Sequence, residues 1–260
     1  MMRTIVMLAC AALLAATHGA LAQSGSRTIK GMVVDSANQK PLPQAVVYFA
    51  RTPTGHRTGS DGTFRIPADS GPVVLMIRRW GYVPVLIPVP PAPGDSVSDI
   101  GTTAMHPVKT DADRAAVQNI DLMVFPELRE FYDRRASFHQ GLFFTPDELL
   151  RAGGSLFTLI RQKPGFRYIC YVDRKGDVDC GQESSRGRTS IMNPNPTSPE
   201  QQPCLIHLWS NGLGPQKTLD QVQLDEVLAV EAYRSPGVTP PVFAGSPCAA
   251  IMLWMKPTAR

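Results

Sequence analysis

Hydrophobic and polar residues alternate in short runs between residues 28 and 89, with the two-residue period of strands that bury one face. Val73, Leu75 and Ile77, for example, share one side of an extended segment. Ser60-Asp61-Gly62 supplies a left-handed turn position before one run, and Ser70-Gly71-Pro72 breaks the chain before another. The predicted strands are Thr28–Asp35, Ala45–Ala50, Thr63–Pro67, Val73–Arg79 and Tyr82–Val89.

A helical pattern follows further along the chain. Pro126–Arg135 places apolar residues on one face and charged residues on the other, so we expect an amphipathic helix that docks on the segment after it. Thr145 and Glu148 have the spacing of a capping box, and Ser155 can cap a second helix. A strand is expected from Phe166. The two predicted helices are Thr145–Ala152 and Leu156–Gln162.

These patterns divide the chain into parts. The proline-rich stretch Pro88–Pro107 is interpreted as an ordered sheet edge or a semi-rigid connector, and it places a boundary near His106. The fold class expected is mainly β, with a sandwich followed by an α+β domain. The predicted divisions are a signal peptide at 1–22, a β-sandwich at 23–106, a linker with an amphipathic helix at 107–140, and a second domain at 141–260.

The first residues have the features of a cleaved secretory signal. Met-Met-Arg precedes an apolar run, Thr4–Ala16, that is too short to span a bilayer, and the segment ends in Ala20-Leu21-Ala22. We therefore expect an exported protein that begins at Gln23. Lipidation at Cys10 is the less favoured alternative, because the apolar run continues well past it. No later apolar segment approaches the roughly 20 residues of a membrane-spanning helix.

Four cysteines remain after the signal is removed, and an exported chain permits two disulfides. Three connectivities are possible. Residues 170–180 indicate a hairpin in which Cys170 directly faces Cys180, which favours that bridge and leaves Cys204 for Cys248. A zinc site is the disfavoured alternative, because these spacings do not resemble paired Cys-x-x-Cys ligands.

The same hairpin gathers three carboxylates on one face, Asp173, Asp177 and Asp179. Like charges on facing strands destabilise a hairpin unless something compensates them. Calcium is one compensation. The basic neighbours Arg174 and Lys175 are the favoured one, so we predict no metal site here.

The remaining chemistry argues against an enzyme. The four histidines that follow the signal lie far apart, and no nucleophile motif, phosphate loop or dinucleotide fingerprint is present. The formal net charge of +4 is scattered rather than gathered in a basic block, which disfavours nucleic acid as a partner. We therefore predict a non-enzymatic protein without a cofactor, in preference to a secreted hydrolase. The histidines are His56, His106, His139 and His207.

The first half of the chain resembles the carboxypeptidase regulatory-like family. The segments that carry the resemblance are Ile29–Asp35, Lys40–Val47, Thr58–Phe64 and Arg79–Tyr82. The resemblance implies a prealbumin-like β-sandwich, a fold grouped with carbohydrate-binding sandwiches, without catalytic residues. Trp80 and Tyr82 are the candidate ligand-binding residues, weighed against the blander interpretation that they pack in the core or at its rim.

The second half is similar to the plug of TonB-dependent outer-membrane receptors, from Gly141 to Lys256. Matching segments are Phe144–Leu149, Leu156–Ile160, Lys163–Phe166, Leu219–Gly237 and Cys248–Trp254. Ser210-Asn211-Gly212 replaces the family's aspartate-glycine turn, and Ser184–Pro203 is an insert expected to form a loop. A receptor barrel of about 22 strands would need on the order of 200 residues after Trp254, so we expect a plug-like module without its barrel.

Together the two resemblances imply a binding or scaffolding protein of the bacterial envelope, in the periplasm or at the outer-membrane periphery. The expected partner is an envelope or outer-membrane protein, bound through the plug-like module. The alternative is a carbohydrate-binding protein that holds a glycan on the sandwich.

Overall fold

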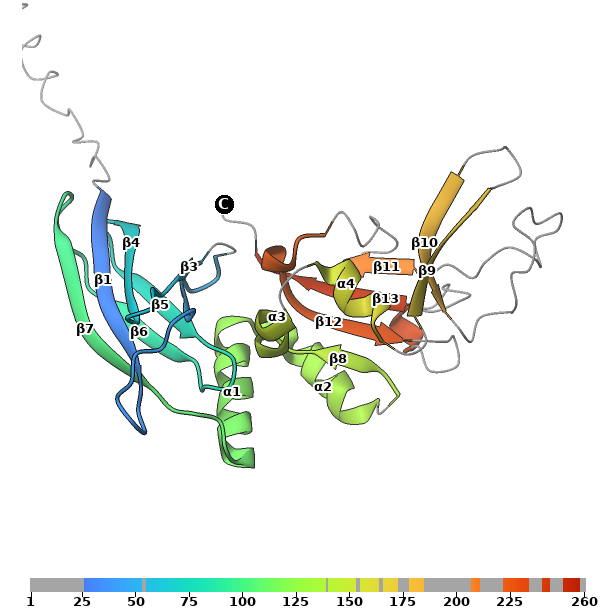
Figure 1. The fold of residues 1–260 in the computed structure, drawn as a ribbon, viewed down its shortest axis with the longest axis horizontal. Coiled ribbons are helices and arrows are strands. Elements are labelled where there is room, and N and C mark those ends of the chain that lie inside the picture. Colours follow the sequence, from blue (N-terminus) through green and yellow to red (C-terminus); the bar gives the residue numbers. More distant parts are fainter. Residues whose placement is uncertain are drawn as a thin grey trace, which may run out of the picture.

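The computed structural model shows a mainly β protein with an N-terminal sandwich and a later α+β unit (Figure 1). The predicted signal peptide, Cys10 and nearly all of the 184–203 insert lie outside the described residues. The structure describes residues 26–52, 55–138, 140–152, 155–163, 166–172, 178–184, 207–210, 222–233, 240–243 and 250–257.

Two sheets form the sandwich, one with the strand order β4-β1-β7 and the other with the order β3-β2-β5-β6. The alternation predicted from the sequence is confirmed in β4, where Phe64, Ile66 and Ala68 are buried and their neighbours are exposed. Their side chains join the sandwich core. The strands are β1 (Ser26–Asp35), β2 (Val46–Phe49), β3 (His56–Arg57), β4 (Thr63–Asp69), β5 (Val73–Arg78), β6 (Val85–Val89) and β7 (Val97–Met105).

The proline-rich stretch ends in a strand rather than a connector. Strand β7 pairs in parallel with β1, from Thr28 opposite Val97 to Asp35 opposite Met105, so the ordered-edge interpretation is the one confirmed. A bulge interrupts the pairing, and Gly101 there has a φ of 69°, a conformation that glycine adopts without strain. Gly62 likewise has a φ of 76°, as expected for the turn before β4.

A helix that the sequence analysis did not predict follows the sandwich. Helix α1 (Asp111–Val124) leads into the 3-10 turn η1 (Pro126–Leu128) and helix α2 (Arg129–Ser137). The last two elements replace the single helix expected at Pro126–Arg135, and Leu128, Phe131 and Tyr132 are buried there, as predicted.

The start of α1 is a capping box between Thr110 and Asp113. The Lys109 N–H, the Thr110 N–H and the Thr110 hydroxyl donate to Oδ2 of Asp113 at 2.9, 2.8 and 2.9 Å. These hydrogen bonds, that from Lys109 first, lower the pKa of Asp113 to about 2. The carboxylate therefore stabilises the helix start above the ordinary pKa of aspartate, and this contribution is lost as the pH falls through about 2.

Replacing Thr110 with alanine removes the hydroxyl donor and leaves the two backbone donors. We expect the pKa of Asp113 to rise while staying below the ordinary aspartate value of 3.8. Carboxyl-carbon NMR titration measures this directly. An unchanged pKa in Thr110→Ala would show that the hydroxyl contributes nothing to the capping box.

The second unit is built on a four-stranded sheet with the order β11-β13-β12-β8. Thr145 and Glu148 form the predicted capping box, and Ser155 caps the next helix by accepting from the Thr158 N–H at 3.2 Å. The elements are β8 (Leu142–Phe144), α3 (Pro146–Ala152), α4 (Leu156–Arg161), β9 (Phe166–Val172), β10 (Val178–Ser184), β11 (His207–Ser210), η4 (Leu224–Glu226), β12 (Val227–Tyr233), η6 (Pro241–Phe243) and β13 (Ala250–Met255).

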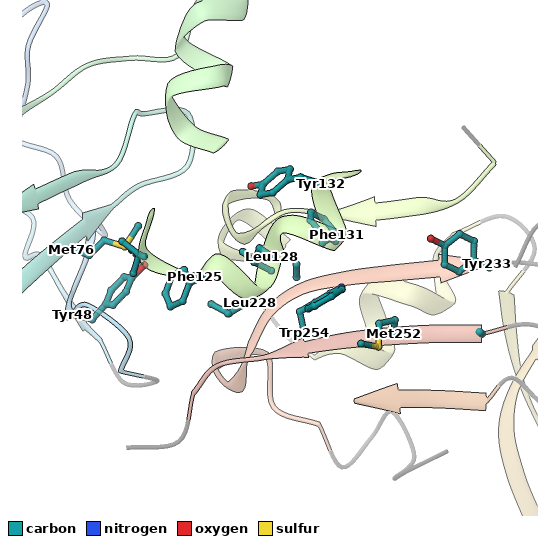
Figure 2. Packing of buried hydrophobic residues seen from close by; sticks show 13 residues of the cluster. Tyr48, Met76, Phe125, Leu128, Phe131, Tyr132, Leu228, Tyr233, Met252 and Trp254 are labelled. Atoms are coloured by element: carbon teal, nitrogen blue, oxygen red, sulfur yellow. Dashed lines mark hydrogen bonds between the residues drawn. The ribbon is translucent and has the colours of Figure 1, made fainter. Parts of the chain in front are cut away.

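One hydrophobic cluster joins the two units. Tyr48 and Met76, from the sandwich, face Phe125 and Leu128, and the cluster continues to Trp254 on β13 (Figure 2). Helix α1 stands between the sandwich and the C-terminal sheet (Figure 1). The outer face of β5 is therefore buried as well as its inner face, and the two units share a core.

Candidate functional site

A half-open cleft of about 480 Å³ lies where the two units meet, within the size range of small-ligand sites. Strands β2 and β5 form one wall, and helix α3, turn η4 and the chain around β12 and β13 form the other. The sandwich contributes Val46, Tyr48, Gly55, Arg57 and Arg78, and the second unit contributes Pro146, Leu149, Leu150, Gln223, Leu224, Asp225, Val227, Leu228 and Lys256.

Arg78 anchors the cleft. Its side chain is buried and forms ion pairs with Asp121 on α1 and with Asp147 on α3, the latter at 2.5 Å from Nη1 to Oδ1. Its Nε donates to the Tyr48 hydroxyl at 3.3 Å. The Tyr132 hydroxyl donates to the other oxygen of Asp121 at 2.5 Å. A single arginine therefore ties the sandwich to both helices that flank it.

The protonation states in this network follow from burial and charge. Burial lowers the pKa of Arg78, but Asp121, Tyr48 and Asp147 outweigh it and hold that pKa well above the ordinary value. Burial raises the pKa of the Asp147 carboxyl, and the positive charge of Arg78 opposes this. Burial also raises the pKa of Tyr132, so its hydroxyl remains a donor. The network holds a guanidinium between two carboxylates.

A second buried carboxylate lies deeper in the C-terminal sheet. Glu231 is fully buried on β12 and accepts bonds from Arg134 Nε and Nη2 at 2.8 and 2.9 Å. The Tyr233 hydroxyl and the indole N–H of Trp254 donate to it at 2.8 and 2.7 Å. All four donors are satisfied within the protein, so this cluster is a structural support for the sheet rather than a reactive group.

The structure places Trp80 and Tyr82 in different surroundings. Trp80 is 48% exposed, and the guanidinium of Arg151 lies 4.5 Å from the centre of its ring. Tyr82 packs against the sandwich core, and its hydroxyl donates to Asp35 at 3.0 Å. Burial, followed by that hydrogen bond, raises the pKa of Tyr82. Trp80 keeps an accessible ring surface, whereas Tyr82 is anchored; the ligand-binding role of both stays a prediction.

The cysteine hairpin has the expected register. Strands β9 and β10 are antiparallel, and Cys170 lies directly opposite Cys180. The two disulfides stay predictions, since Cys204 and Cys248 lie outside the described residues. Asp173 and Asp177 lie outside them too. Within the described part of the chain, no three His, Cys, Asp or Glu side chains are grouped to hold a metal ion.

Sequence reasoning missed Arg78 and its partners, although a signal was present. Residues Val73–Ile77 are uninterruptedly apolar, which is typical of a strand buried on both faces. An arginine at the end of such a strand, beside a second covering layer, needs buried acids as partners. Asp121 and Asp147 supply them from helices 43 and 69 residues further along the chain.

Comparison with known families bears on the sandwich. Residues 29–101 match the model of the CarboxypepD_reg-like domain, which covers β1 to most of β7. Over these residues the sandwich is similar to the carboxypeptidase regulatory-like family. The resemblance noted in the sequence is thereby confirmed for this unit, and the plug resemblance of residues 141–256 stays a prediction.

Solved structures match parts of the chain only weakly. A type II cohesin–X-dockerin complex from Acetivibrio cellulolyticus is 18% identical over 32% of this chain and 55% of its own, with a TM-score of 0.26. The Bacillus anthracis TIE protein is 14% identical over 63% of this chain and 25% of its own, with a TM-score of 0.26. The minor pilin GBS52 of Streptococcus agalactiae is 18% identical over 33% of this chain and 45% of its own, with a TM-score of 0.24. The match thus spans about half or less of each.

No curated protein matches the chain. Among the described residues, no helix combines the length and the apolar character that crossing a bilayer requires.

Proposed function

We propose that the chain is an exported, non-enzymatic binding protein of the bacterial envelope, in the periplasm or at the outer-membrane periphery. It contacts an envelope or outer-membrane protein through its plug-like C-terminal unit. The observation that carries this proposal is the cleft between the units, whose two walls are held at a fixed separation by Arg78 and the shared core. A preformed concave surface binds without the entropic cost of assembling it.

The C-terminal wall offers the more suitable contact surface. Gln223 and Asp225 are exposed beside the partly buried Leu224, and all three line the cleft. An apolar centre with a polar rim is the usual composition of a protein interface. The side chains of Asp121, Asp147, Tyr48 and Tyr132 are bonded to other side chains of the junction, which supports binding rather than catalysis.

Site-specific photo-crosslinking tests this proposal on the full chain. A benzophenone amino acid replaces Gln223 on the cleft rim or, as the matched control, Val97 on the sandwich edge, which is 54% exposed. We expect Gln223 to yield one discrete adduct with an envelope protein, and excess unlabelled protein to abolish it. Adducts from Val97 alone would contradict binding through the C-terminal unit, and adducts from neither position would reject a protein partner.

A second candidate is carbohydrate binding by the sandwich, favoured by the exposed ring of Trp80. Aromatic rings with accessible faces suit stacking on sugars. A glycan array would compare the wild type with Trp80→Ala and with Tyr82→Phe, which loses only the hydroxyl bonded to Asp35. Binding lost in the first variant and kept in the second would support this function, and a blank array would remove it.

A further inference from the structure

A smaller cavity of about 180 Å³ adjoins the cleft and shares Arg57, Arg78, Val46 and Leu150 with it. Four arginines line this cavity, and no aspartate or glutamate is among its lining residues. The lining residues with polar or aromatic side chains are Gln44, Arg57, Arg78, Arg79, Trp80 and Arg151. Like charges gathered in one cavity repel one another, so an anionic group among them would be stabilised.

Among the described residues, carboxylates neutralise one of the four arginines. Arg78 is paired with Asp121 and Asp147. Arg57 makes no hydrogen bond or ion pair with the described part of the chain, and Arg151 contacts the ring of Trp80. Arg79 donates from Nη1 to the Pro43 carbonyl, a neutral acceptor. Three arginines therefore line a common cavity in which the described part of the chain pairs none of them with a carboxylate.

The alternative to a bound anion is that these arginines are simply hydrated by solvent. Arg57 and Arg151 are exposed and Arg79 is half-buried, but solvation alone does not account for three arginines that line one cavity from different elements, β3, the chain after β5 and α3. Arg79 and Arg151 are also held in place, by the Pro43 carbonyl and by the Trp80 ring respectively. Guanidinium groups fixed around a cavity match the geometry of a bound oxyanion.

The adjoining cleft differs in character. Its lining is mixed, but Leu149, Leu224 and Leu228 give one wall an apolar part. Lys256 and Asp225 also line it, and they offset each other's charge. A ligand that fills both cavities would therefore place an anionic group among the arginines and an uncharged body in the cleft.

We propose that the two cavities form one site for a small amphipathic acid, whose phosphate, sulfonate or carboxylate group binds between Arg57, Arg79 and Arg151. This site shares the cleft with the proposed partner contact, but its test does not depend on that contact, because probe binding is measured on the protein without a partner.

Fluorescent probes test the site on the mature chain. Anilinonaphthalene sulfonate carries a sulfonate on an aromatic body, and N-phenylnaphthylamine has a similar body without the charge. We expect the sulfonate to bind with a stoichiometry of one and the neutral amine at least tenfold more weakly. Arg57→Gln should weaken sulfonate binding by about tenfold, as expected for one charge-assisted hydrogen bond. Arg57→Gln/Arg151→Gln should weaken it further.

Arg114→Gln is the matched control, because it removes the same charge from an exposed pair with Asp111 outside both cavities. Its affinity should equal that of the wild type. Competition by inorganic phosphate and by acetate needs no variant and shows which oxyanion the arginines prefer. Equal binding of the neutral amine, unchanged affinity in Arg57→Gln, or no competition by either anion would overturn the proposal.

Discussion

Replacing Arg78 with methionine should lower the free energy of unfolding by about 3–5 kcal/mol, the usual cost of breaking a buried ion pair by removing one partner. Methionine fills much of the same space but leaves Asp121 and Asp147 without their counter-ion. Urea unfolding followed by circular dichroism measures the change. We expect a single transition, because the two units share a hydrophobic cluster.

Arg114→Met is the comparison for this prediction, since Arg114 pairs with Asp111 on the exposed surface of α1. It should cost no more than about 0.5 kcal/mol. The deficit of Arg78→Met should also shrink as the pH falls from 7, because burial raises the pKa of the Asp147 carboxyl and its protonation removes a charge that the substitution leaves unpaired. A loss below about 1 kcal/mol at pH 7 would show that the Arg78 network does not hold the units together.

The second large effect is expected at Glu231, in the C-terminal sheet. Glu231→Ala should cost about 3–5 kcal/mol, because Arg134, Tyr233 and Trp254 lose the acceptor they share in a buried position. Glu231→Gln keeps one carbonyl oxygen and should cost less. Chemical unfolding of the three proteins at one pH gives the comparison.

Arg134 supplies an internal control for Glu231. The same guanidinium also pairs with Glu130, at 3.2 Å, but the Glu130 side chain is 70% exposed. Glu130→Ala should therefore change stability by about 0.5 kcal/mol or less. Similar losses in Glu130→Ala and Glu231→Ala would mean that burial of the carboxylate does not govern the strength of this pair.

Local patterns predicted the elements whose structure depends on neighbouring residues. The alternation of Phe64 and Ile66 identified β4, and the capping box of Thr145 and Glu148 located the start of α3. The hairpin register that sets Cys170 opposite Cys180 likewise follows from a short stretch of sequence. Each of these features depends on interactions among residues within about ten positions of one another, so contacts with distant parts of the chain did not override the local pattern.

Helix α1 was missed although its sequence carried signals. Val117, Ile120 and Val124 have helical spacing, and Thr110 can cap the first turn. Asp121 and Val124 are its only buried residues, and the remaining positions are partly or fully exposed, so the apolar stripe is thin. Its position depends on the Arg78–Asp121 pair as much as on apolar burial.

The candidate site was the least predictable feature, because it is assembled from distant parts of the chain. Trp80 was singled out and does line the arginine cavity. Arg57, Arg79 and Arg151 were not, since each is an ordinary basic residue until the fold brings β3, β5 and α3 together. A scattered net charge in the sequence can thus become a local concentration of charge in the structure.

The parallel pairing of β1 and β7 has a mechanical consequence. The chain enters the sandwich at Ser26, at one end of this pair, and leaves it at Met105, at the other end. Tension between these points pulls the two strands past each other lengthwise, so their hydrogen bonds share the load instead of opening one after another. A protein tethered through its first residues and pulled through its C-terminal unit would meet this resistance before the sandwich could be extended.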